Sequence, residues 1–492
     1  MAQKAAKTGK PAPAASLYPN QQTLFIEQSI DKALQHHTAG RLSEAEAIYQ
    51  QILQADPKQP DALHLLGVLA HQAGKHDIAV DLITKSLAEN PYFPDAHNNL
   101  GNVYKDMGRL DEAVTSYQKG LKIKPDYFEA HNNLGIVLRD LGRPDEAVAS
   151  YRKALAIKSD FAEAHNNLGN ALHDLGKLDE AVESHQKALV LNPQYAEAHN
   201  NLANAFKDLG RLDKQPEHLE KAVESYHKAL AIKPDLAGAY NNLGNVLKDQ
   251  GRLDEAVSCL QKAIDINPHY HSARHLLNSL IGETTASAPR EFVEDAFNSY
   301  AENFDHHLVN DLAYTMPSLL KDALLELDIQ EGKFKNVMDM GCGTGLSGAA
   351  FRDIAETLIG IDLSRNMVRK AEEKNIYDEL YVDDIIERLE GLGTDFDLYI
   401  SSDVFIYVGD LLPIFESIKK HAAKNALLVF STEHFDGNGF VLNNKCRYAH
   451  SKEYVLSIAE RLGFQLEYYA RSNLRKESDD WIVGDIYILK CG

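Results

Sequence analysis

Residues 95–128 read DAHNNLGNVYKDMGRLDEAVTSYQKGLKIKPDYF, and a near copy follows at once, EAHNNLGIVLRDLGRPDEAVASYRKALAIKSDFA. A fixed period of this length is the signature of a repeat architecture, in which each unit packs against its neighbours. Residues 27–271 are therefore predicted to form an α solenoid of seven such units. The units begin at residues 27, 61, 95, 129, 163, 197 and 238.

Each unit is predicted to contain two helices and a tight turn. Steps of 100° per residue place Ala96 and Leu100 on one face of the first helix. Gly108 ends that helix, and Asp111 lies near the start of the second. Pro125 ends the second helix, because proline cannot continue the hydrogen-bonding pattern. Neither helix can bury its apolar face alone, so neighbouring units must stack.

The repeats resemble the tetratricopeptide repeat, and their Asn-Asn-Leu-Gly form is similar to the superhelical repeats of O-GlcNAc transferases. In such arrays the first helices line the concave surface, so this resemblance implies an amide-rich groove that binds a protein or peptide partner. The alternative is a solvated helix face that only keeps the solenoid soluble. The predicted groove residues are Asn99, Asn133, Asn167, Asn201 and Asn242.

Two irregular features of the repeats have simple interpretations. Histidine recurs once per unit, as His97, His131, His165 and His199. Stacked helices lie on the order of 10 Å apart, whereas zinc needs its ligands near ~2 Å, so no metal site is predicted. The unit from residue 197 contains an extra segment, 214–220, which we expect to form a longer loop between its two helices.

The second half of the chain changes character. Residues 272–288 are predicted to supply a capping helix and a linker. Beyond them, short apolar runs alternate with helical stretches, the pattern of a doubly wound, Rossmann-like α/β domain over residues 289–492. Residues 1–26 are predicted to be a disordered N-terminal segment. The predicted strands are 336–341, 357–362, 380–384, 396–401, 426–431, 465–470 and 485–490.

A glycine-rich turn follows the first of these strands, in the stretch 337–345, VMDMGCGTG. Glycines there allow a tight turn and let a ligand approach without a Cβ in the way. The spacing is G-x-G-x-G, whereas dinucleotide-binding proteins use G-x-G-x-x-G. Acidic residues end the next two strands: Asp362, which can accept both hydroxyls of a ribose, and the pair Asp383 and Asp384.

These elements, in this order, resemble a class I S-adenosylmethionine-dependent methyltransferase, and the combination with the repeats is similar to a group of predicted bacterial methyltransferases. The resemblance implies S-adenosylmethionine as cofactor. Asp362 would hold its ribose, and Asp384, with Asp383 as second choice, its adenine. Tyr300 would belong to a helix that covers the cofactor. The residues expected to line its methionine end are Asp339, Gly341, Gly343 and Gly345.

Methyl transfer from a sulfonium is an in-line displacement, for which the protein supplies proximity, alignment and a dry site. By position after the fourth and fifth strands, Asp403, Tyr407 and His434 are the candidate catalytic residues. A histidine has a suitable pKa for a base, although a lone histidine in a loop is more often structural. The acceptor atom (O, N or C) stays open, as does its source, a small molecule or a protein. A possible acceptor pocket contains Arg447, Tyr448 and His450.

Composition limits the remaining classes of function. The chain has 492 residues and a net charge of −21, which disfavours nucleic-acid binding. It has no apolar run long enough to span a membrane. Its four cysteines form no CxxC pair, which suits a reducing compartment, so we expect a cytoplasmic protein. The alternative to an enzyme is a non-catalytic repeat scaffold with a vestigial methyltransferase fold.

Overall fold

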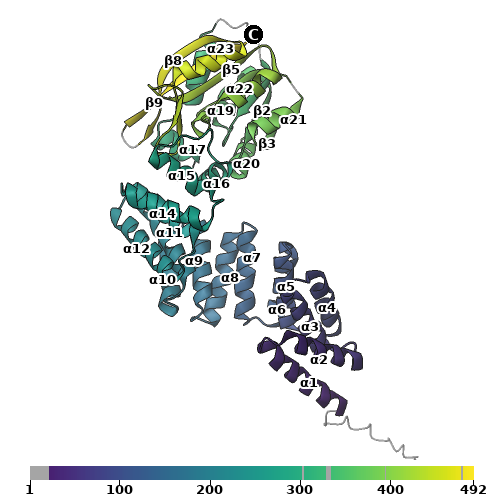
Figure 1. Cartoon of the computed structure of the whole chain (residues 1–492). Coiled ribbons are helices and arrows are strands. Elements are labelled where there is room, and N and C mark those ends of the chain that lie inside the picture. The colour runs from purple at the N-terminus through teal and green to yellow at the C-terminus, as the bar shows by residue number, and fades with distance from the viewer. Residues whose placement is uncertain (1–20, 302–303, 328–333, 394, 478–479) are drawn as a thin grey trace, which may run out of the picture. The chain divides into compact units, whose positions relative to one another are not determined.

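The structure is a computed structural model that describes residues 21–301, 304–327, 334–393, 395–477 and 480–492 (Figure 1). Contacts divide the chain into two compact units, Met1–Pro234 and Asp235–Gly492. The second unit therefore contains the seventh repeat together with the sheet. Residues 1–20 of the predicted N-terminal segment lie outside the described residues, and a helix already begins at Gln21.

The first unit is built from helical hairpins, which confirms the predicted solenoid (Figure 1). In each hairpin the first helix packs against the second, and the second packs against the first helix of the next hairpin. The helices are α1 (Gln21–Thr38), α2 (Leu42–Ala55), α3 (Pro60–Gln72), α4 (His76–Glu89), α5 (Pro94–Asp106), α6 (Leu110–Ile123), α7 (Phe128–Asp140), α8 (Pro144–Ile157), α9 (Ala162–Asp174), α10 (Leu178–Leu191), α11 (Ala196–Leu212) and α12 (Pro216–Ile232).

Packing within a hairpin explains the glycine of the Asn-Asn-Leu-Gly pattern. A Cβ on Gly135 in α7 would lie 2.6 Å from the ring of Tyr151 in α8, and a Cβ on Gly101 would lie 2.6 Å from Tyr117. Tyr117 and Tyr151 are fully buried. The missing side chain on the first helix therefore makes room for a large ring on the second, and this allows the two helices to approach closely.

The extra segment 214–220 does not form the long loop that we predicted. It lengthens both helices instead, since α11 and α12 have 17 residues each, whereas α9 has 13 and α10 has 14. In other repeats a glycine with positive φ, such as Gly142 or Gly176, ends the first helix. The equivalent Gly210 stays helical and packs against Leu219. Lys214, with φ of 55°, turns the chain instead, and Pro216 starts α12.

The second unit begins with the seventh hairpin, α13 (Ala237–Asp249) and α14 (Leu253–Ile266), and the capping helix α15 (His271–Ile281). A mixed, mostly parallel sheet follows, with strand order β3-β2-β1-β4-β5-β7-β6; β9 also pairs with β5, and β8 pairs with β9. The strands are β1 (Phe334–Met340), β2 (Ala355–Asp362), β3 (Glu379–Val382), β4 (Phe396–Ser401), β5 (Ala422–His434), β6 (Phe440–Leu442), β7 (Tyr448–His450), β8 (Phe464–Glu477) and β9 (Asp480–Cys491). The predicted α/β fold is confirmed, although β6 and β7 were not predicted.

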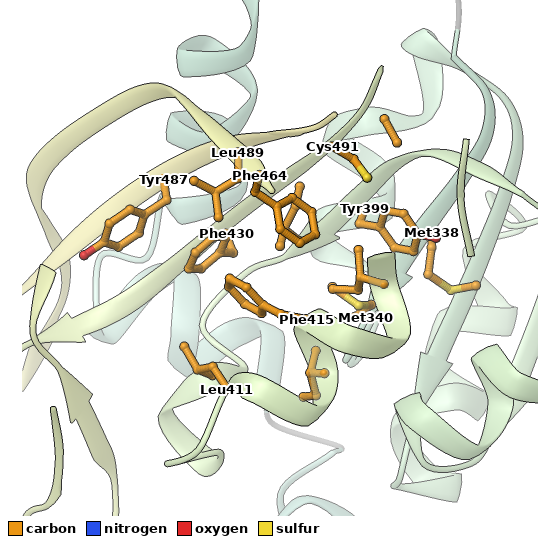
Figure 2. Packing of buried hydrophobic residues seen from close by; sticks show 14 of the residues in the cluster. Met338, Met340, Tyr399, Leu411, Phe415, Phe430, Phe464, Tyr487, Leu489 and Cys491 are labelled. Atoms are coloured by element: carbon orange, nitrogen blue, oxygen red, sulfur yellow. The ribbon is translucent and has the colours of Figure 1, made fainter. Parts of the chain in front are cut away.

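Apolar side chains cover both faces of the sheet. Met338 and Met340 of β1 belong to one buried cluster, which also contains Phe415 and Phe430 (Figure 2). Val337, the residue before Met338, belongs to a second cluster on the opposite face. Alternation along a strand buried on both sides is the expected pattern of a doubly wound sheet. The surrounding helices are α16 (Arg290–Tyr300), α17 (Phe304–His306), α18 (Met316–Leu325), α19 (Leu346–Phe351), α20 (Arg365–Glu373), α21 (Ile385–Leu392), α22 (Leu412–His421) and α23 (Lys452–Leu462).

Candidate functional site

The glycine-rich turn lies between β1 and α19. Gly341, Gly343 and Gly345 have φ of 71°, 53° and 92°, a region that residues with a Cβ rarely adopt. The N–H groups of Gly341 and Cys342 both donate to the carbonyl of Ile361, at 2.8 and 2.9 Å, which fastens the turn to the end of β2. A Cβ on Gly343 would meet only the edge of Phe304, at 3.9 Å. The backbone is therefore accessible at Gly343.

The carboxylate of Asp362 is held by backbone on both sides. One oxygen accepts from Gly343 N–H at 2.9 Å and the other from Ser364 N–H at 2.8 Å. Burial raises the pKa of Asp362 to about 6, although these two hydrogen bonds oppose the shift. The side chain is thus fixed in position, and each oxygen keeps a further lone pair for a ligand hydroxyl.

A cavity of about 670 Å³ opens beside Gly343 and Asp362. This volume lies within the ordinary range of ligand and cofactor sites. Its walls are mainly apolar and aromatic, and charged side chains such as Asp362, Asp403 and Arg475 lie among them. The aromatic rings come from three places: α16, the segment after α16 and the segment after β4. They are Phe297, Tyr300, Phe304, Tyr314 and Tyr407.

The structure brings most of the predicted cofactor residues to this cavity. Its lining includes Gly341, Gly343, Asp362, Asp383, Asp384 and Tyr300.

Asp339 and Gly345 do not line the cavity. Asp339 is fully buried beneath the turn, where Oδ2 accepts from the Tyr377 hydroxyl at 2.6 Å. Burial is the main cause that raises the pKa of Asp339 to about 7, and the nearby charge of Asp362 adds to this effect. A Cβ on Gly345 would meet Tyr377 at 3.1 Å. Both residues therefore support the turn on the side away from the cavity.

The two acids after β3 have structural partners as well as a place at the cavity. Asp384 caps α21, because its Oδ1 accepts from the N–H groups of Ile386 and Glu387 at 2.8 and 3.2 Å. Asp383 forms an ion pair with Arg388 at 2.7 Å. These interactions fix the two carboxylates at one end of the cavity.

The other end is formed by the segment after β4. Asp403 has φ of 62°, and its N–H donates to the Ser431 hydroxyl at 3.0 Å. Ser402 shares a hydrogen bond of 2.8 Å with the Tyr314 hydroxyl. Burial raises the pKa of Tyr407 to about 12, so its phenol stays protonated at neutral pH. Asp403 and Tyr407, two of the three predicted catalytic residues, therefore lie together.

Arg475 of β8 holds this end together. Its guanidinium is buried and forms ion pairs with Asp403 and with Glu433, the second at 2.5 Å. Arg447 joins the same network, at 2.7 Å from Glu433 and 2.9 Å from Glu477. Arg475 was not predicted, because nothing in the local sequence of β8 indicates that it reaches a residue 72 positions earlier.

His434, the third predicted catalytic residue, is outside the cavity lining. Nδ1 lies 2.7 Å from Asp485 and Nε2 lies 2.8 Å from Asp436, so both ring nitrogens already have carboxylate partners. These contacts hold the imidazole in place, and its catalytic role stays a prediction. Of the expected acceptor pocket, Arg447 lines the cavity, but Tyr448 and His450 are fully buried elsewhere.

Four of the five predicted groove asparagines make contacts between repeats. Asn133 donates to Asn98 at 3.1 Å, Asn167 to Asn132 at 3.1 Å and Asn201 to Asn166 at 3.2 Å. Asn99 contacts the His64 ring nitrogen at 2.8 Å. Asn242 has a hydrogen bond from Asn241 at 3.4 Å. All five predicted groove asparagines are half-buried, and part of their hydrogen-bonding capacity is used within the solenoid.

The histidines that recur in the repeats close the turns between units. Nε2–H donates to the carbonyl of the residue six positions earlier. The acceptors are Pro91 for His97, Pro125 for His131, Ser159 for His165 and Pro193 for His199, at 3.0–3.1 Å. Among the described residues, no group of side chains is arranged to hold a metal ion. No helix in the described part of the chain is long and apolar enough to cross a bilayer.

Comparisons with known proteins match both halves of the chain. Models of the TPR repeat and the tetratricopeptide repeat match segments within residues 30–270, and a model of the methyltransferase domain matches residues 312–477. No curated protein matches the chain.

Among solved structures, the chain is similar to MamA, with 32% identity over 34% of this chain and 95% of MamA, at a TM-score of 0.31. It is also similar to YrrB, a TPR protein described as having an unusual peptide-binding site. That match has 25% identity over 39% of this chain and 96% of YrrB, at a TM-score of 0.33. A tetratricopeptide repeat protein from Parabacteroides merdae shares 18% identity over 53% of this chain and 100% of its own, at a TM-score of 0.41.

Proposed function

The chain is a tetratricopeptide-repeat array fused to a methyltransferase domain, and from this premise we propose that it is an S-adenosylmethionine-dependent enzyme. The cofactor binds in the cavity beside Asp362, and the repeats recruit a protein or peptide, either the acceptor itself or a partner that presents it. The observation that carries the proposal is the carboxylate of Asp362, fixed by two backbone N–H groups at the edge of a cavity of about 670 Å³.

The residues present fit this cofactor. A carboxylate with a free lone pair on each oxygen suits two neighbouring ribose hydroxyls. The absence of a Cβ at Gly343 leaves room for a ligand against the turn. Aromatic rings at Phe297, Tyr300 and Phe304 suit a cationic sulfonium, which is attracted to the faces of such rings.

S-adenosylmethionine supplies a methyl group that is already activated for transfer. The chain's own residues hold and align the reactants. The apolar walls exclude water, which strengthens the electrostatic interactions inside. Tyr407, protonated at neutral pH, donates a hydrogen bond rather than acting as a base. Asp403, held by Arg475, is the acidic group beside it and is placed to accept a hydrogen bond or a proton from the acceptor.

Transfer of a labelled methyl group tests the function. The full chain is incubated with methyl-labelled S-adenosylmethionine and an extract of the cells that express it. We expect label in an acceptor with the wild type and a much weaker signal with Asp362→Asn. Equal labelling by the two proteins contradicts the proposed site. Binding of the cofactor without transfer to any acceptor favours a scaffold.

A further inference from the structure

Residues 284–290 join the capping helix α15 to α16, and we call them the strap. This stretch was predicted to be a linker, yet it is packed like an added strand. Ala288 N–H donates to the Tyr407 carbonyl at 3.0 Å, and the Ala286 carbonyl accepts from Gly409 and Asp410 N–H at 2.9 and 2.7 Å. Ser287 and Val408 form an antiparallel bridge. The strap is therefore fixed to the segment after β4 by backbone hydrogen bonds.

Side-chain contacts fix the upstream end of the strap. The Thr285 hydroxyl lies 2.5 Å from the Tyr448 hydroxyl, and Thr284 Oγ1 accepts from Leu442 N–H at 3.2 Å. Both partners belong to the β6–β7 hairpin. The strap thus has partners on two separate parts of the sheet domain.

The same residues form a wall of the cavity. Its lining includes Ala286, Ser287, Ala288, Pro289 and Arg290, together with Tyr407 and Val408. Arg290 pairs with Glu294 at 2.6 Å and approaches Glu387 of α21 at 3.7 Å. The strap therefore links the segment after β4 with α21, the helix that Asp384 caps.

The seventh repeat is packed against the same region. Leu260 and Ile264 of α14 share one apolar cluster with Leu276 of α15 and with Cys446, and Phe292 of α16 packs against it. The Ser279 hydroxyl lies 3.2 Å from the sulfur of Cys446. Because the strap directly follows α15, displacement of that helix would move the cavity wall.

We infer that the strap is part of the cofactor-binding site and couples cofactor affinity to the seventh repeat. The inference rests on the proposed function. It extends the functional domain upstream of the residues 312–477 that match the methyltransferase family. Strap docking and cofactor binding stabilise each other, because both need the same wall in place. A partner that displaces α15 lowers cofactor affinity, and bound cofactor resists that displacement.

Ala288→Pro in the full chain tests the inference. Proline removes the N–H that donates to Tyr407, while the residue before Pro289 already favours the extended backbone. Ala288→Gly keeps the N–H and is the matched control. We expect Ala288→Pro to raise the Kd for S-adenosylmethionine about tenfold relative to Ala288→Gly, as the loss of one such bond implies. Equal Kd values in two folded variants overturn the inference.

If Ala288→Pro does not fold, hydrogen exchange of the wild type tests whether the strap is part of the cofactor-binding site. Addition of S-adenosylmethionine should slow exchange in peptides that contain Ala288 and Gly409, and not in peptides from α9. Unchanged exchange at the strap in a cofactor-saturated protein overturns the inference while the proposed function stands. A wild type that does not bind the cofactor refutes the proposed function, and the inference with it.

Discussion

The carboxylate of Asp362 accepts a hydrogen bond from the backbone N–H of Gly343 at 2.9 Å. This contact joins the end of β2 to the turn after β1 at the point where the cavity begins. Gly343 adopts φ of 53°, which any residue with a Cβ would adopt at a cost. The orientation of the carboxylate is therefore determined by the backbone, before any ligand binds.

Cofactor affinity should depend on pH through Asp362. Burial raises its pKa to about 6, so the carboxylate is ionised above this pH and protonated below it. A protonated group loses acceptor capacity, so affinity for S-adenosylmethionine should fall as the pH falls through 6. Calorimetric titrations between pH 5 and 8 measure this. Asp362→Asn lacks the titratable carboxyl at position 362, so its affinity should depend less on pH in this range than that of the wild type. A wild-type affinity that stays constant down to pH 5 contradicts the prediction.

The glycines inside the repeats should tolerate alanine very differently. In Gly135→Ala the new Cβ would lie 2.6 Å from Tyr151, and such overpacking costs about 1–3 kcal/mol. Gly238 has open space around its Cβ position and lies in α13, so Gly238→Ala should gain up to about 1 kcal/mol from helix propensity. Urea denaturation followed by circular dichroism compares the two variants with the wild type. Similar effects of both changes would refute the packing argument.

Loss of Arg475 should destabilise the sheet domain. Arg475→Met removes the buried partner of Asp403 and leaves Glu433 with Arg447 alone, and breaking a buried ion pair costs about 3–5 kcal/mol. Arg369→Met is the control, because Arg369 pairs with Glu373 on the surface of α20 and should change stability by no more than about 0.5 kcal/mol. Thermal unfolding measures both. A melting temperature for Arg475→Met as high as that of the control would show that the network contributes little.

The repeats and the positions of seven strands along the chain could be predicted because both depend on local periodicity. The interval between equivalent residues fixes the helical hairpin, and apolar runs such as 357–362 identify buried strands. The glycine-rich turn and Asp362 were predicted for a related reason. They occur at the ends of neighbouring parallel strands, which meet at one edge of the sheet.

Features that depend on distant contacts could not be predicted in this way. The strap has the composition of a linker. Its place as a wall of the cavity depends on backbone hydrogen bonds to Tyr407 and Gly409, which the sequence does not reveal. Arg475 reaches the cavity from β8, far along the chain from Asp403. His434 was placed correctly at the end of β5, but the sequence does not reveal that Asp485 and Asp436 occupy its ring nitrogens.

Titration of the full chain with S-adenosylmethionine tests the central claim most directly. The wild type should bind one cofactor per chain. Asp362→Asn should raise the Kd by about 10- to 100-fold, because a charge-assisted contact is worth about 1.5–3 kcal/mol. Asp353→Asn changes an acid that pairs with Lys321 on the surface, and its Kd should equal that of the wild type. Absence of binding by the wild type, or an unchanged Kd in Asp362→Asn, would contradict the assignment of this cavity as the cofactor site.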